Sequence, residues 1–209
     1  MNFSKLAYRK AQLLKWQFAG KTAHFWHNQK AIERARAEII KWKKLIAELS
    51  PKAVPASPIT MYDSVDIGTV PGFAQAVAGY VGGNWPTYDG LVKRFPKAHH
   101  LSIAVNAGED AECLDIETGD ATPADAPNWV RRQHARGIKR PVVYANASTM
   151  PSVLNALSAA RIGRNEYRVW TAHYTYRAHI EPGSDATQYT DKALGRNLDA
   201  SLCSPTFFD

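Results

Sequence analysis

Eight short runs rich in apolar residues follow one another along the chain, and this series most constrains its fold. Each run has the length of a β-strand, and polar or helical segments separate it from the next. The expected strands cover residues 59–63, 76–81, 101–105, 112–117, 141–145, 168–172, 186–190 and 197–201.

Three of the intervening segments are predicted to be helices, at residues 87–95, 123–136 and 149–160. The second is predicted to begin at Thr122-Pro123, which supply a good N-cap and a first-turn proline. It is predicted to end before Gly137, a typical terminal glycine. Strands that alternate with helices favour parallel pairing with right-handed crossovers. We therefore predict an α/β fold, a small TIM-like (β/α) barrel with reduced helices over residues 59–209. That is shorter than the roughly 200–250 residues usual for such barrels.

Residues 1–50 have a different pattern and are predicted to form basic amphipathic helices. A hairpin of two helices is the preferred interpretation, and one long helix is the alternative, with Gly20 either in a turn or inside a helix. The first apolar stripe consists of Phe3, Ala7, Ala11, Leu14 and Phe18. The second consists of Ile32, Ala35, Ile39, Trp42, Ile46 and Leu49. Residues 51–58 contain three prolines and are predicted to be a linker.

The positive charge of the chain is concentrated in the same N-terminal segment. Residues 1–50 contain eleven Lys or Arg and three Glu, a balance of +8, whereas residues 51–209 have a balance of −1. This asymmetry predicts attraction to an anionic partner, either wall polymer or a membrane surface. Nucleic acid is the less favoured partner and is not expected. The aromatic residues among the lysines fit an interface or simple packing between helices: Trp16, Phe25, Trp26 and Trp42.

Several classes of protein and of site do not fit this sequence. No apolar run approaches the roughly 18–20 residues that span a bilayer, and the N-terminus does not resemble a secretory signal. Action outside a membrane would therefore need another route of release. Of the two cysteines, Cys113 is expected to be a buried free thiol, and neither cysteine has metal-ligand spacing. The seven histidines are scattered, so we predict no metal site and no cofactor.

The fourth expected strand ends in two acids, Asp115 and Glu117. Side chains at i and i+2 share one face of a strand, where two carboxylates repel each other and lose hydration. In the simpler interpretation, Asp115 caps a loop and Glu117 pairs with an arginine. In the second interpretation, Asp115 and Glu117 form a catalytic pair at the mouth of the barrel. The negative charge of one carboxylate then keeps the other carboxyl protonated.

Other polar residues recur at the same ends of the expected strands, where a parallel barrel holds its working groups. Carboxylates ringed by Tyr and Trp are what a site that cleaves sugars needs. The residues of this kind at or near the ends of the expected strands are Asp63, Asp66, Tyr80, Asn106, Tyr144, Asn146, Trp170, His173, Tyr174, Gln188, Tyr189, Asp199 and Ser201.

Residues 59–203 resemble the family 25 glycoside hydrolases, the lysozyme-type muramidases, and a related group of phage and actinobacterial domains. Asp115-Ile116-Glu117 is similar to the Asp-x-Glu of the family's fourth strand. Residues 141–144 resemble its fifth strand, and residues 169–174 its Trp-x-Ala-x-Tyr sixth strand. Residues 186–190, with Gly195 and Leu198-Asp199, resemble its Gln-Tyr and terminal Asp segment.

The resemblance implies cleavage of the β-1,4 bond between N-acetylmuramic acid and N-acetylglucosamine, without a metal. It implies that Glu117 is the general acid and that Asp115 tunes it or stabilises an oxazolinium-like intermediate. Asp199 matches the acid of the last strand. The first-strand acid is Asp63 or Asp66, because residues 61–66 depart from the family's opening motif. The implied substrate-binding residues are Asp66, Tyr80, Asn106, Tyr144, Trp170, Tyr174 and Gln188.

The expected function is therefore that of a phage-type endolysin, a peptidoglycan hydrolase with a cationic N-terminal targeting segment. Such a protein would be made in the host cytoplasm and would act on the bacterial cell wall after release. The alternative is a catalytically silent barrel that binds cell-wall carbohydrate, or a phage structural component that grips the wall.

Overall fold

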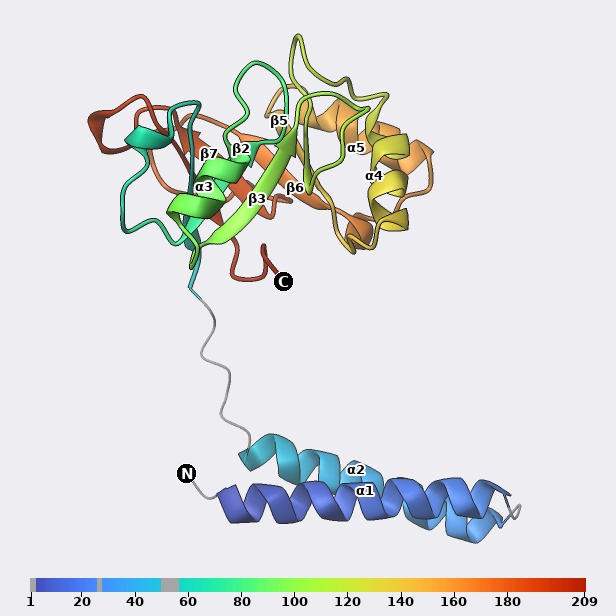
Figure 1. Cartoon of the computed structure of the whole chain (residues 1–209). Helices are drawn as coiled ribbons and strands as arrows, with labels where there is room; N and C mark the ends of the chain where they lie inside the picture. Colours follow the sequence, from blue (N-terminus) through green and yellow to red (C-terminus); the bar gives the residue numbers. More distant parts are fainter. Residues whose placement is uncertain (1–2, 26–27, 50–56) are drawn as a thin grey trace. The chain divides into compact units, whose positions relative to one another are not determined.

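The computed structural model describes residues 3–25, 28–49 and 57–209. The chain forms two compact units, residues 1–55 and residues 56–209. The first unit is helical and the second is a barrel (Figure 1). The predicted linker, residues 51–58, lies outside the described residues apart from its last two positions.

Two helices make up the first unit, α1 (Phe3–Phe25) and α2 (Gln29–Leu49), and they pack side by side (Figure 1). Asn28 precedes α2, and its side-chain oxygen accepts a hydrogen bond from the backbone nitrogen of Ala31 at 3.1 Å. This contact is an N-cap that satisfies a backbone donor of the first helical turn. Helix α1 continues through Gly20, so this glycine lies inside a helix and not in a turn.

The side of α1 that is packed differs from the predicted stripe. Leu14 and Phe18 are 66% and 74% exposed, although the sequence assigned both to the apolar face. The indole of Trp16 is covered instead, with the guanidinium of Arg34 5.7 Å from its ring centre. Two sets of residues in α1 have helical spacing, so spacing alone did not identify the packed face. The buried or half-buried set includes Leu13, Trp16, Ala19 and Ala23.

The second unit is a closed barrel in which eight strands follow their order in the chain. Strands β1 to β7 pair in parallel, whereas β8 is antiparallel to both β7 and β1. The strands are β1 (Ile59–Asp63), β2 (Ala76–Tyr80), β3 (His99–Ala104), β4 (Cys113–Asp115), β5 (Val142–Asn146), β6 (Arg168–Ala172), β7 (Ala186–Thr190) and β8 (Asp199–Cys203). This architecture confirms the prediction of a small TIM-like barrel with reduced helices.

The prediction of parallel pairing throughout is wrong for β8. Residues 191–198 connect β7 to β8 with one short 3-10 helix, η3 (Ala193–Gly195). A parallel crossover needs about a dozen residues or more, so this connection can only return the chain in the opposite direction. Strand β8 also starts at Asp199, two positions later than predicted, and β4 is limited to three residues, Cys113–Asp115.

Three helices pack against the barrel, and each lies within a predicted segment: α3 (Tyr88–Arg94), α4 (Ala126–Ala135) and α5 (Met150–Ala159). Helix α4 begins later than predicted, because the carboxylate of Asp125 accepts hydrogen bonds from the backbone and hydroxyl of Thr122. These bonds hold residues 122–125 in a turn before the helix. Two further 3-10 helices are η1 (Ile67–Thr69) and η2 (Arg164–Glu166).

The core forms layers on the two faces of the barrel wall. Residues on alternate strand positions fill the interior, among them Met61, Cys113 and Trp170. Their neighbours, such as Leu114 and Val143, face outward and pack under α4 and α5. Both cysteines are buried free thiols, as predicted for Cys113. The same alternation turns Asp63 and Asp115, two positions beyond Met61 and Cys113, toward the interior.

Candidate active site

Acids from three strands meet at one end of the barrel. Asp63 ends β1 and Asp115 ends β4, and both belong to the strand positions that face the interior. Asp199 is the first residue of β8, but because β8 is antiparallel, its first residue lies at the same end. In the register of β1 with β8, Asp63 is the direct partner of Asp199. The sequence grouped these residues correctly, although it assumed the wrong strand direction for Asp199.

Asp63 and Asp199 form a pair of carboxyls, and Asp63 is the one that holds the proton between them. Asp63 is 3% exposed, and burial together with the charge and hydrogen bonding of Asp199 raises its pKa well above the usual range. Burial also raises the pKa of Asp199, to about 6, while its hydrogen bond with Asp63 opposes that rise. These directions favour a protonated Asp63 that donates to an ionised Asp199 near neutral pH.

Asp115 and Glu117 form a second pair of acids. Asp115 is 4% exposed, and burial, followed by the charges of Glu117 and Asp120, raises its pKa to about 8. Glu117 is half-buried, and its pKa is also raised, mainly by burial and then by the charge of Asp120. Asp120 was not singled out in the sequence, although it lies three positions after Glu117 in a polar turn. The simpler interpretation of a Glu117–arginine pair does not hold, because among the described residues no arginine bridges Glu117.

One oxygen of each buried aspartate has no hydrogen-bond partner among the described residues, Oδ2 of Asp63 and Oδ1 of Asp115. A buried carboxyl oxygen normally finds a partner, because leaving it unpaired costs about 1–3 kcal/mol. Such groups in a native fold call for an explanation, and a catalytic site is one of the places where they are found.

A hydrogen-bonded triad lies beside the acids. The side-chain oxygen of Gln188 accepts from the hydroxyls of Tyr144 at 2.6 Å and Tyr174 at 3.1 Å. Because its oxygen is used in this way, the amide NH₂ of Gln188 remains to donate to Asp63, which lowers the pKa of that acid. The sequence predicted all three residues of the triad as substrate-binding. Tyr144 and Gln188 are both buried, so neither presents a surface to a ligand in this structure.

Trp170 does not present a surface to a ligand, in contrast to its predicted role as a substrate-binding residue. It is 1% exposed, its ring centre lies 4.5 Å from that of Tyr144, and its Nε1 donates to Oγ of Ser201 at 2.9 Å. The cause is its position in the middle of β6, two residues before the strand ends, on the interior face.

Asp66 is also separate from the acids. It caps η1, and its carboxylate accepts a hydrogen bond from the backbone nitrogen of Gly68 at 2.8 Å. Of the two first-strand candidates, the structure therefore places Asp63 in the site and Asp66 on an exposed turn. The prediction that Asp66 binds substrate is not supported by this position.

Two cavities lie at this end of the barrel, one lined by Glu117 and the other by Asp120. One has a volume of about 290 Å³, and Glu117 and Tyr174 contribute to its wall. The other, of about 430 Å³, is lined by Asp120 and by the predicted residues Tyr80 and Asn106. Its wall also includes Trp85, which is 61% exposed. Trp85 was not predicted from the sequence, although its place in the polar segment that follows β2 was a usable signal.

These groups together can exchange a proton with a bound ligand and offer aromatic faces to it. No family model matches the chain, and a search of curated proteins found no match either.

Proposed function

We propose that the protein hydrolyses a glycosidic bond of bacterial peptidoglycan, in the manner of a muramidase. The observation that carries the proposal is the gathering of Asp63, Asp115, Glu117 and Asp199 at one barrel mouth, where burial raises the pKa of every one of them. Glycoside hydrolysis uses such carboxyls, one protonated and one ionised, on either side of the scissile bond. The resemblance of residues 59–203 to the family 25 glycoside hydrolases supports the same chemistry.

Glu117 is the proposed general acid. It borders the cavity of about 290 Å³, so its carboxyl can reach a ligand there, and its raised pKa favours the protonated form that an acid catalyst needs. Asp115 lies deeper, and with a pKa of about 8 it is neutral at pH 7. A neutral Asp115 is suited to tuning Glu117 rather than to stabilising positive charge.

Asp199 is the proposed anionic group. With a pKa of about 6 it is mainly ionised at pH 7, so it can stabilise positive charge that develops on the sugar or on its acetamido group. The hydrogen bond from Asp63 would keep Asp199 oriented. After Glu117 has given its proton to the leaving oxygen, water adds to the anomeric carbon and its proton returns to the Glu117 carboxylate.

The glycan strand is proposed to cross both cavities, with the scissile bond near Glu117. Tyr174 is 45% exposed and Trp85 61% exposed, so each can place a flat face against a pyranose ring. Asn106 and Tyr80 supply polar groups in the cavity of about 430 Å³. Asp120 lines one cavity and Glu117 the other, and the backbone nitrogen of Asp120 donates to the carbonyl oxygen of Glu117 at 3.1 Å, so the two walls are close to each other.

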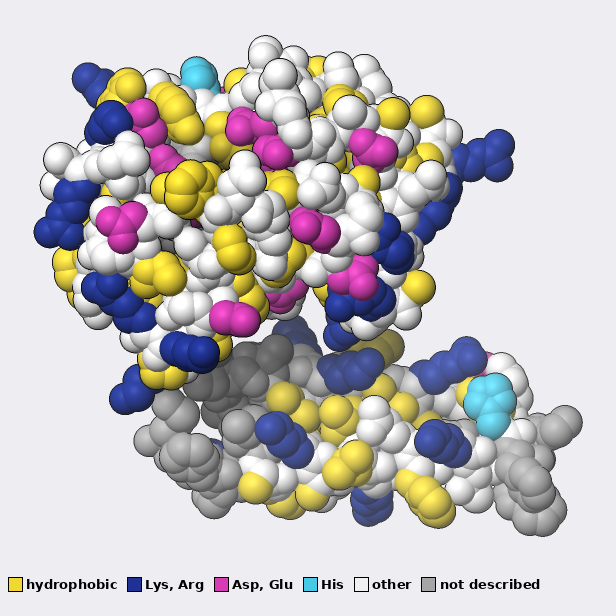
Figure 2. All heavy atoms as spheres, turned by 45° about the horizontal axis from the view of Figure 1, so that its top comes forward, with side chains coloured by type: hydrophobic (Ala, Val, Ile, Leu, Met, Phe, Trp, Pro, Cys, Tyr) yellow, Lys and Arg dark blue, Asp and Glu magenta, His cyan; other side chains and the backbone are white. Residues whose placement is uncertain are grey.

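The helical unit is proposed to bring the enzyme to an anionic surface. In Figure 2, Lys and Arg side chains are interspersed with hydrophobic ones on the visible face of the two helices. Leu14, Phe18 and Ile40 are 66–74% exposed, which fits a membrane interface better than a purely polar wall polymer. No helix in the described part of the chain is long and apolar enough to cross a membrane. Release from a host cell by a phage-type route belongs to the same proposal.

The proposal is tested by digesting purified peptidoglycan with the wild type and with Glu117→Gln, followed by mass spectrometry of the reduced products. Loss of a general acid costs roughly 10²–10⁴-fold in rate. The control is Asp89→Asn, an exposed acid in α3, which should retain wild-type turnover. Thermal unfolding of each variant shows whether it is folded.

The products separate the alternatives. Fragments that end in reduced muramic acid, from the wild type and the control only, establish a muramidase with Glu117 essential. Fragments that end in reduced glucosamine would still show hydrolysis, but at the other glycosidic bond of the glycan strand. Tight binding to walls of several bacteria without soluble fragments would overturn the proposal in favour of a silent carbohydrate-binding barrel.

A further inference from the structure

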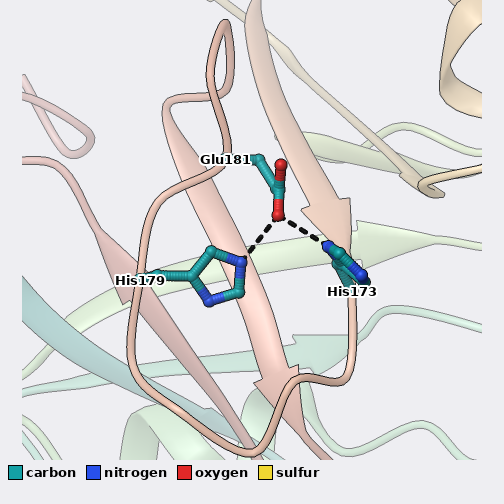
Figure 3. Close-up of side chains that lie close together, drawn as sticks. All are labelled: His173, His179 and Glu181. Atoms are coloured by element: carbon teal, nitrogen blue, oxygen red, sulfur yellow. Dashed lines mark hydrogen bonds and ion pairs between the residues drawn. The ribbon is translucent and has the colours of Figure 1, made fainter.

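Two histidines and a glutamate converge on the loop between β6 and β7. His173 directly follows β6, and His179 and Glu181 lie farther along the same loop. Oε1 of Glu181 lies 2.6 Å from Nδ1 of His173 and 2.7 Å from Nε2 of His179 (Figure 3). The three ligand atoms all lie within 4.8 Å of one another. Figure 3 shows both rings directed at the same carboxylate oxygen.

The surroundings of His179 and Glu181 orient these groups. Nδ1 of His179 lies 2.8 Å from the carbonyl oxygen of Arg177. A carbonyl can only accept, so Nδ1 carries the proton and Nε2 is the nitrogen available for a ligand. A metal-bound histidine commonly uses its second nitrogen in this way. The backbone nitrogen of Glu181 donates to Oγ1 of Thr187 on β7 at 2.8 Å, which holds Glu181 against the barrel.

We propose that His173, His179 and Glu181 bind a divalent transition metal, for which Zn²⁺ is the best match. Two imidazole nitrogens and one carboxylate oxygen are a ligand set that zinc accepts, and a fourth position remains for water. The metal would replace the hydrogen bonds that now join the two rings to Glu181. This site is distinct from the acids of the proposed hydrolysis and does not depend on that reaction.

Binding requires the three ligand atoms to move: the Glu181 contacts lengthen, and any pair as far apart as 4.8 Å closes to the spacing of a tetrahedral site. Metal–ligand bonds of about 2.0–2.2 Å in a tetrahedral site put neighbouring ligand atoms roughly 3.3–3.5 Å apart. The contacts of Glu181 at 2.6 and 2.7 Å must therefore open by several tenths of an ångström. His173 is exposed and the other two side chains are only half-buried, so the loop has room for this change.

Bound metal would fix a wall of the candidate active site. His173 lines the cavity of about 290 Å³ together with Glu117 and Tyr174. A metal that links His173 to His179 and Glu181 would close the loop on itself and hold Tyr174 in place. The metal would in this way order the loop beside Glu117.

No metal site was predicted from the sequence, because the three ligands have no recognised spacing. Five residues separate His173 from His179, and one separates His179 from Glu181, in an irregular loop. Only the path of the loop brings the three side chains together.

The first experiment is a titration of the full-length protein, freed of metal by a chelator, with Zn²⁺ alone and without carbohydrate. The wild type should bind one equivalent and gain melting temperature, because a ligand specific to the folded state stabilises it. His179→Gln should weaken binding at least about tenfold. His24→Gln, which removes an exposed histidine of α1, is the matched control and should bind as the wild type does.

A second readout tests the place of binding. Arg177 is exposed and lies between the proposed ligands, so trypsin can cut after it. Zinc should slow this cut in the wild type and in His24→Gln, but not in His179→Gln. No binding by the wild type, or equal binding and protection in His179→Gln, would overturn the proposal. Glu117→Gln should bind zinc normally, so a failure of the hydrolase proposal would be recognised separately.

Discussion

Asp63 lies directly opposite Asp199 in the antiparallel pairing of β1 with β8. This relationship brings the last strand's first residue to the barrel end where β4 presents Asp115 and leads into Glu117. In a parallel β8 the first residue would lie at the opposite end, far from these acids. The direction of one strand thus decides whether the acidic site has three members or four.

The stability of the barrel should fall as pH rises from acid to alkaline conditions. The folded-state pKa of Asp115 is about 8 and that of Asp199 about 6, both above the ordinary value of 3.8. The native state therefore holds these protons more tightly than the unfolded chain does. The stability gained from this is present in full below pH 3.8 and is lost as pH rises through 6 and then 8.

Asp115→Asn tests the origin of this pH dependence. An amide cannot ionise, so the variant should lose less stability than the wild type between pH 5 and pH 9. A difference of about 1 kcal/mol or more is expected, which corresponds to roughly 2–4 °C in Tm for a domain of this size. Thermal unfolding followed by circular dichroism at both pH values measures it. Asp89→Asn should keep the wild-type pH dependence of stability. If Asp115→Asn also kept it, Asp115 would not be the origin of that dependence.

Trp170→Phe should destabilise the barrel without any contact with a ligand. The substitution removes the hydrogen bond from Nε1 to Ser201, leaves that hydroxyl unpaired, and opens a void in the interior. The expected loss is about 1–3 kcal/mol in the free energy of unfolding. The matched change Trp85→Phe, at a side chain 61% exposed, should cost about 0.5 kcal/mol or less. Urea unfolding of both variants makes the comparison, and equal stabilities would show that Trp170 is not a core residue.

Trp85→Ala should weaken binding of glycan while leaving the fold intact. Trp85 lines the cavity of about 430 Å³, and removal of an aromatic face from a sugar site should raise KM more than it lowers kcat. A rise of roughly tenfold corresponds to about 1.4 kcal/mol of lost binding. Steady-state kinetics on soluble glycan fragments measures both constants. Phe73→Ala is the control, since Phe73 is 69% exposed but lines neither cavity.

Phe18→Ser should weaken binding of the protein to vesicles that contain anionic lipid. An exposed phenylalanine inserted into the interface contributes about 1.5–3 kcal/mol, so its loss should cost roughly tenfold or more in affinity. Gln17→Ser changes an exposed polar neighbour and should have no such effect. Co-sedimentation with anionic and with neutral vesicles, at two salt concentrations, gives the affinities. Stronger binding to DNA than to anionic vesicles, in competition, would favour a nucleic-acid partner instead.

The sequence alone determined the number, order and approximate limits of the strands. Their short apolar runs are local features, and burial of alternate residues follows from the two-residue period of a strand. The same period placed Asp63 and Asp115 on the interior face, since each lies two positions beyond a buried residue of its strand.

The antiparallel direction of β8 could have been predicted from the sequence, because residues 191–198 are too few for a parallel crossover. Tertiary structure decided three points that local pattern leaves open. It buried Trp170 within the closed barrel. It also chose which of two apolar stripes of α1 is packed, leaving Phe18 exposed. Finally, it gathered His173, His179 and Glu181 from an irregular loop. Each of these points depends on which surfaces meet in space, and a pattern along the chain contains no such information.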